Sequence, residues 1–201
     1  MPFSRIACFV LISLLPSVFA HAQQKLPVEV SRVNFNSNAR PYKWNNIVIQ
    51  LQANQNPDPQ AANPRYVDNI TVTLTLGYES KGASPFTFYQ AEATLVTLET
   101  GKKKEIAFWM PYDVVQRDNL PKEPKYWIVE LEVNGQQLNL LVDNKKSFSS
   151  GFTNLDSING FKSQASGKLS ETDGILVPTY LSPNPYIDQR EPAAFIRKEQ
   201  Q

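Results

Sequence analysis

The chain has 201 residues, of which 20 are lysine or arginine and 19 are aspartate or glutamate, so the formal net charge is only +1. A nucleic-acid-binding protein draws much of its affinity from a basic surface that neutralises phosphates, and this balanced charge argues against that class. The single cysteine, Cys8, and the single histidine, His21, both lie within the first 22 residues.

The N-terminus has the pattern of a secretory signal peptide. Arg5 supplies a positive charge, residues 6–19 form a mostly apolar run, and Ala20-His21-Ala22 places small residues where a signal peptidase cleaves. A bilayer-spanning helix needs about 20 apolar residues, so this run is too short for a membrane anchor, and no later apolar stretch is long enough either. We therefore expect cleavage of residues 1–22 and export of residues 23–201 to the periplasm, the outer membrane or the exterior.

Cleavage would leave a chain without cysteine or histidine. Such a chain has no imidazole for a Ser-His-Asp triad, no thiol nucleophile and no ligand set for an ordinary zinc site. Its glycines fit neither a dinucleotide fingerprint nor a P-loop. The cluster of Asn154, Asp156 and Asn159 does not have the spacing of an EF-hand. We predict no cofactor, no metal and no enzymatic activity, although two distant carboxylates could still serve a glycan hydrolase.

From residue 26 onward the dominant hydrophobic period is two, which indicates β-strands. Alternating segments occur in chain order at residues 47–51, 70–78, 91–98, 104–109, 127–133 and 138–142. Asn134-Gly135 predicts a tight type I′ hairpin, because both residues accept positive φ. Thr100-Gly101 predicts a second hairpin, with a slightly longer loop, between the strands on either side of it.

Other segments break this alternation. Residues 54–64 are rich in proline, asparagine and glutamine and predict a loop, while residues 111–119 predict one helical turn that begins at a proline. Apolar residues recur every three positions over 152–161 and predict a short helix that Gly160 weakens. Residues 178–201 contain four prolines and predict an extended tail, either flexible or docked through an aromatic side chain.

Together these elements predict a mainly β fold, an immunoglobulin-like antiparallel β-sandwich over residues 23–150. Trp127 is the expected core tryptophan, although the Cys–Trp–Cys pattern of antibody domains is absent. Residues 151–201 would form a C-terminal extension, partly helical and then proline-rich and flexible.

Aromatic residues are the candidate binding residues. Strand alternation directs Trp44, Trp109 and Tyr126 away from the core, and Tyr180 and Tyr186 lie in the C-terminal segment. Outward aromatic rings can stack on sugars or anchor a protein partner. The alternative is that the C-terminal segment or the 111–119 turn covers them.

The strand pattern also resembles a known group of proteins. The segments 26–35, 44–51, 67–78 and 86–98, followed by IAFWMPY at 106–112 and KYWIVELEVNG at 125–135, resemble small exported immunoglobulin-like proteins associated with type IV pilus-like systems of Gram-negative gut bacteria. The resemblance covers residues 26–142 and carries no catalytic signature. It implies a non-enzymatic role in pilus assembly or at the cell envelope.

Three hypotheses follow from the sequence. The first is an exported interaction module of a pilus-like or other envelope assembly, whose partner is another protein or a second copy of the chain. The second is a carbohydrate-binding module that uses exposed aromatic residues. The third is a carboxylate-dependent glycan hydrolase, which would require a deep cleft.

Overall fold

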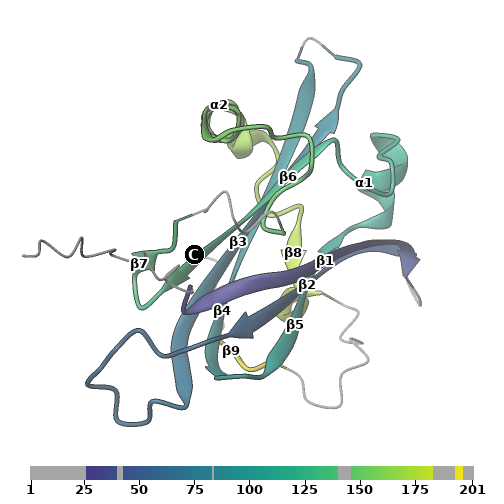
Figure 1. Ribbon diagram of the computed structural model, residues 1–201. Coiled ribbons are helices and arrows are strands. Elements are labelled where there is room, and N and C mark those ends of the chain that lie inside the picture. Colours follow the sequence, from purple (N-terminus) through teal and green to yellow (C-terminus); the bar gives the residue numbers. More distant parts are fainter. Residues whose placement is uncertain (1–25, 40–42, 83, 140–145, 183–192, 197–201) are drawn as a thin grey trace, which may run out of the picture.

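The computed structural model describes residues 26–39, 43–82, 84–139, 146–182 and 193–196, and within them two antiparallel β-sheets pack face to face (Figure 1). In spatial order the first sheet contains β1 (Val28–Ala39), β2 (Trp44–Ala53), β5 (Lys103–Met110) and β8 (Val177–Pro178). The second contains β7 (Gln136–Gln137), β6 (Tyr126–Val133), β3 (Tyr66–Glu79), β4 (Phe86–Glu99) and β9 (Phe195–Ile196). The predicted β-sandwich is therefore confirmed.

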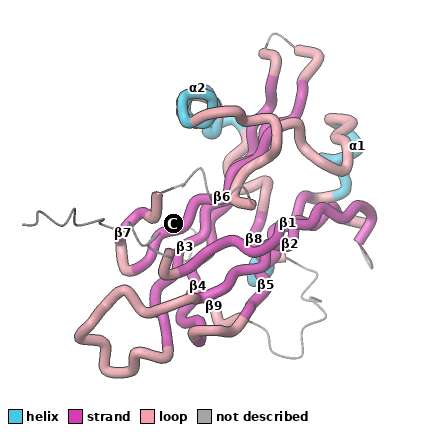
Figure 2. The backbone as a smooth tube through the Cα atoms, viewed as in Figure 1, coloured by secondary structure: helices cyan, strands magenta, loops and turns pink. Residues whose placement is uncertain are grey.

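The order of the strands is that of an immunoglobulin-like sandwich. Strands β1, β2 and β5 share one sheet, and β3, β6 and β7 share the other. Strand β4 belongs to the second sheet and pairs with β3. The helical elements are α1 (Tyr112–Arg117), α2 (Leu155–Ser166) and the 3₁₀ helices η1 (Leu169–Glu171) and η2 (Thr179–Leu181). Figure 2 shows α1 and α2 toward the end of the sandwich at which β3 turns into β4.

Strand alternation places the core between the sheets. Along β2, half-buried and buried residues alternate without a break, and Ile47, Ile49 and Leu51 point inward. From the opposite sheet Trp127 is 8% exposed and packs against Phe35, with ring centroids 5.8 Å apart. The prediction that Trp127 belongs to the core is confirmed.

One predicted hairpin is confirmed and the other is wrong. Asn134 and Gly135 have φ of 51° and 79°, and they join β6 to β7 in the tight turn expected from their sequence. The turn at Thr100-Gly101 instead crosses from one sheet to the other, because β5 pairs with β2 while β4 pairs with β3. Alternation shows which side chains face the core but cannot show which strand supplies the backbone partner.

The predicted loop and helical turn are confirmed. Residues 54–64 connect β2 in one sheet to β3 in the other. Pro111 precedes the first residue of α1, where its missing N–H would have no intrahelical partner. The Tyr89 hydroxyl donates a 2.7 Å hydrogen bond to Asp118 at the end of α1, and this bond attaches the helix to β4.

Two short strands of the described part of the C-terminal segment pair with the sandwich, in line with the expectation that this segment could dock on it. Strand β8 pairs with β5 at one sheet edge, and β9 pairs with β4 at the other. Pro178 fits because an edge strand has no neighbour on one side that needs its N–H. The predicted signal peptide (1–22) and most of the proline-rich part (183–192) lie outside the described residues. No helix in the described ranges is both long and apolar enough to cross a membrane.

Candidate functional site

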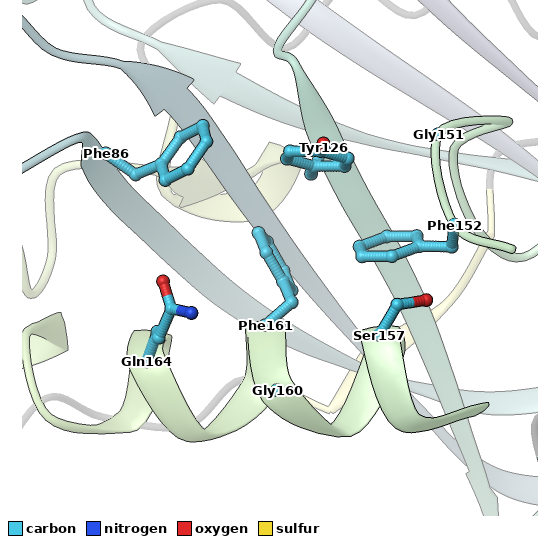
Figure 3. Close-up of a pocket in the computed structure, with 8 residues that line it drawn as sticks. All are labelled: Phe86, Tyr126, Gly151, Phe152, Ser157, Gly160, Phe161 and Gln164. Atoms are coloured by element: carbon cyan, nitrogen blue, oxygen red, sulfur yellow. The ribbon is translucent and has the colours of Figure 1, made fainter. Parts of the chain in front are cut away.

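Helix α2 lies on the outer face of the second sheet, over the ends of β3, β4 and β6 (Figures 1 and 3). Gly77 of β3 pairs with Phe88 of β4 on one side and with Tyr126 of β6 on the other. The ring of Phe161 from α2 sits directly on this glycine, because a Cβ atom at residue 77 would lie 2.6 Å from Phe161 Cε2. Gly77 thus forms the hole that receives the helix.

The sequence determines where α2 begins. Asn154 is the N-cap: its Oδ1 accepts a 2.8 Å hydrogen bond from the backbone N–H of Ser157, and the Ser157 hydroxyl donates back to the Asn154 carbonyl. The helix buries Ile158, Phe161 and Ala165. These residues are one helical face, since they lie three and four positions apart. The predicted helix is confirmed, but it starts later than 152 and continues to Ser166.

A salt bridge adds to this packing. Lys162 of α2 lies 2.5 Å from the Glu130 carboxylate of β6, whose side chain is 14% exposed. Glu130 is therefore paired under the helix.

The helix and the sheet enclose a pocket of about 330 Å³, which we call the α2 pocket. Eight residues line it: Phe86, Tyr126, Gly151, Phe152, Ser157, Gly160, Phe161 and Gln164 (Figure 3). Half of them are aromatic, two are glycines, and the remaining two carry a hydroxyl and a carboxamide. The lining therefore contains no carboxylate, ammonium or guanidinium group.

The aromatic rings of the pocket pack on one another. Ring centroids are 5.0 Å apart for Tyr126 and Phe152, 5.3 Å for Phe152 and Phe161, and 5.6 Å for Phe86 and Tyr126. The corresponding ring planes meet at 35°, 70° and 66°, close to the tilted and edge-to-face arrangements that aromatic pairs prefer. The rings thus form curved walls, and they do not form a flat platform.

The two glycines of the pocket have opposite surroundings. At Gly151 a Cβ atom would lie 2.7 Å from Cε1 of Tyr126, so a glycine is required for the chain to pass this ring. At Gly160 a Cβ atom would meet nothing within 4 Å. Packing therefore explains the first glycine and does not explain the second.

Of the predicted binding residues that the structure describes, only Tyr126 lines the pocket, and Trp109 is buried. Trp109 is 1% exposed, and its Nε1 donates a 3.4 Å hydrogen bond to Oγ1 of Thr179 in the C-terminal segment. The expectation that Trp109 offers an exposed ring is wrong, because that segment packs back onto β5 through β8. The alternative of a covered tryptophan is the correct one.

The other predicted residues are dispersed. Trp44 is half-buried at the start of β2, in the first sheet. Tyr180 is half-buried in η2 and packs on Phe195 of β9, with ring centroids 5.6 Å apart. Tyr186 lies outside the described residues. The structure therefore does not bring Trp44 or Tyr180 together with Tyr126.

The sequence interpretation missed the other aromatic walls of the pocket. The three-residue period over 152–161 includes Phe152 and Phe161, although α2 begins only at Leu155 and Phe161 is its single aromatic residue. Phe86 lies in a strand two positions before Phe88. The available signal was this period, because an apolar helical face packs against the apolar side chains of a neighbouring element. Nothing local indicated that a cavity would remain between them.

A second, more polar groove follows the edge of β1, between the two sheets. It measures about 480 Å³ and includes Arg32 of β1, Lys125, Lys146 and the edge of Trp127. Its charges are partly satisfied, since Arg32 lies 3.4 Å from Glu105 and Lys125 lies 3.4 Å from Glu79.

Shifted ionisable groups gather at α1 rather than at the α2 pocket. A hydrogen bond from Arg117 lowers the pKa of the Asp118 carboxyl, and a second hydrogen bond from Tyr89 acts in the same direction. Burial raises the pKa of the Tyr89 hydroxyl above its usual range. Within the described ranges, no group of three or more His, Cys, Asp or Glu residues is arranged to hold a metal ion.

Comparison with known proteins supports the fold alone. No protein-family model matches the chain, and no curated protein matches it. A crystal structure of a protein from Akkermansia muciniphila superposes with a TM-score of 0.63, at 15% sequence identity over 86% of this chain and 94% of that one.

Proposed function

We propose that this chain is a non-enzymatic, exported interaction module that contributes to a pilus-like or other cell-envelope assembly. The observation that carries the proposal is the α2 pocket on the outside of the sandwich, whose eight lining residues offer apolar surface and neutral polar groups. Such a lining binds a ligand by desolvation and shape, and it holds none of the acidic or basic groups that proton transfer requires, apart from a tyrosine.

Three further observations support the assignment to the envelope. The first 22 residues have the pattern of a secretory signal, and the strand sequences resemble exported immunoglobulin-like proteins of pilus-like systems. The bacterial neighbour has the same fold over nearly its whole length. A β-sandwich is a common architecture for surface proteins that work through interaction, so the three observations agree.

A carbohydrate-binding module is the alternative that the exposed aromatics suggested. It requires rings that present open, coplanar faces to successive sugars. The walls of the α2 pocket are tilted against one another, and Trp109 is buried. These observations favour a protein partner over a glycan.

Localisation and cross-linking in the source organism test the proposal. The chain with a C-terminal tag should be recovered from periplasmic, outer-membrane or extracellular fractions, with Gln23 as its N-terminal residue. In-cell cross-linking should join it to envelope or pilus subunits identified by mass spectrometry. Recovery from the cytoplasm with residues 1–22 still attached would refute export and with it the proposed function.

A further inference from the structure

We infer that the α2 pocket receives an aromatic side chain carried by an uncharged peptide segment of a protein partner. This inference rests on the proposed function and adds to it the place of contact and the chemistry of the group that binds there. The case has four parts: an unexplained glycine, the charge of the lining, the arrangement of the rings, and the polar group at the rim.

Gly160 is the first part of the case. A helix is less stable with glycine than with alanine at an interior position, because the glycine backbone loses more conformational freedom on folding. Gly77 and Gly151 are required by close contacts, whereas a Cβ atom at Gly160 would enter open space. Gly160 is exposed and lines the α2 pocket from the helix side (Figure 3). With no side chain at this lining position, the helix leaves the pocket unobstructed there, at the expense of helix stability.

The absence of charged groups in the lining favours a neutral ligand. Burying an unpaired charge is costly, and no residue of the lining carries a formal charge that could pair with a charged ligand. Lys162, which follows the lining residue Phe161 on the helix, is already paired with Glu130. A peptide segment bearing lysine, arginine, aspartate or glutamate at the inserted position would therefore be rejected.

The rings select an aromatic group. Phe86, Tyr126, Phe152 and Phe161 already pack at centroid separations of 5.0–6.1 Å in tilted or edge-to-face pairs. A further ring that enters the pocket can extend the same pattern and gain the contacts that such pairs make. The volume of about 330 Å³ lies at the small end of ligand sites, which suits one inserted side chain better than a string of sugars.

The rim indicates that the group arrives on a peptide. Gln164 is exposed at the edge of the pocket, and its side chain points toward Phe86 (Figure 3). A carboxamide has both donors and an acceptor, so it can form hydrogen bonds with the N–H and C=O groups of a peptide backbone. Ser157 is less available, because its hydroxyl already serves the N-cap of α2.

Titration of defined probes into the isolated protein tests the inference. The ¹⁵N-labelled chain of residues 23–201 is titrated with acetyl-GSFSG-amide, and separately with acetyl-GSASG-amide, acetyl-GEFEG-amide and cellohexaose. We expect the first probe to shift the backbone amides of Gly151, Gly160 and Gln164, with a Kd on the order of 1 mM, as one inserted side chain allows. The alanine probe and the oligosaccharide should bind at least about tenfold more weakly, and the glutamate-flanked probe more weakly than the first.

Gly160→Leu and Gly160→Ala are the matched variants. The leucine side chain would fill the pocket and abolish the response to acetyl-GSFSG-amide, while the alanine methyl would weaken it only about two- to fivefold. Both variants should keep the circular dichroism spectrum of the wild type. If Gly160→Leu does not fold, Gly160→Ala together with Gln164→Leu carries the test.

The inference fails if the phenylalanine and alanine probes bind alike, if cellohexaose shifts the pocket amides instead, or if folded Gly160→Leu binds as well as the wild type. This failure is distinguishable from failure of the proposed function. Wild-type chain that still cross-links to envelope subunits, but does not bind the phenylalanine probe, would leave the function intact and move the contact elsewhere.

Discussion

The contact between Gly77 and Phe161 allows a quantitative test of how α2 is held on the sheet. Gly77→Ala places a Cβ atom 2.6 Å from Phe161 Cε2 and 3.2 Å from its Cζ. The Phe161 ring would have to withdraw by roughly 1 Å to restore an ordinary carbon–carbon contact. It cannot do so freely, because the rings of Phe88 and Phe152 each lie 5.3 Å away, centroid to centroid.

Two opposing effects determine the expected magnitude. Overpacking a dense core costs about 1–3 kcal/mol, whereas replacing a glycine in a strand by alanine recovers about 0.5–1 kcal/mol of backbone entropy. We therefore expect Gly77→Ala to lower the free energy of unfolding by about 1–2 kcal/mol. For a chain of this size that corresponds to a melting temperature lower by about 2–8 °C.

A double-mutant cycle in urea isolates the contact. Phe161→Ala removes a ring that is 6% exposed and should by itself cost about 3–5 kcal/mol. In that background the alanine at residue 77 keeps only an ordinary 3.5 Å contact with Cε1 of Phe88, so Gly77→Ala should become neutral or stabilising, with a coupling energy of about 1–3 kcal/mol. Equal effects of Gly77→Ala in both backgrounds, or a stabilising effect in the wild type, would refute the idea that Gly77 is the hole for Phe161.

Three further outcomes follow from the structure. Gly160→Ala should raise the free energy of unfolding by about 0.5–1 kcal/mol in urea melts, because it removes a helix-interior glycine without creating a clash; an unchanged or lower value would contradict the open space found there. The Asp118 pKa is lowered in the folded protein, so its stabilisation is present above the unfolded pKa, near 3.9, and is lost as pH falls through the folded value. Asp118→Asn should therefore flatten the decline of the urea midpoint in acid, and an unchanged acid limb would argue against the role of the Arg117 hydrogen bond. Thr179→Val removes the hydroxyl that donates to the Ala107 carbonyl at 2.7 Å and should cost about 1–2 kcal/mol. It should also speed proteolytic cleavage of the C-terminal segment; cleavage at the wild-type rate would mean that β8 holds without this bond.

Local features of the sequence determined much of the secondary structure. The period of two identified β2, β3, β4 and β6, and Asn134-Gly135 specified a hairpin because few residue pairs accept two positive φ angles. The inward position of Trp127 followed from the alternation of its own strand. These features depend on the residues next to each position, which a sequence displays directly.

The pairing of the strands and the burial of outward-facing side chains depended on tertiary structure. The sequence showed that residues 104–109 form a strand, but the hydrogen bonds that place β5 beside β2 join residues more than 50 positions apart in the chain. Trp109 faces away from the core as its alternation predicts, yet the C-terminal segment buries it through contacts with Thr179, 70 positions away. A residue's face on its strand is a local property, whereas its exposure is decided by whichever distant segment packs there.

At the α2 pocket, too, the sequence determined the local elements and the tertiary structure decided how they pack. The sequence determined a helix with an apolar face that includes Phe161, and a sheet with outward aromatic residues. Only the tertiary structure decided that Phe161 would lie on Gly77, that Gly151 would pass over Tyr126, and that Gly160 would be left facing open space. The physical reason is that a cavity is the volume that remains after several elements have packed, and no single segment of the chain encodes that volume.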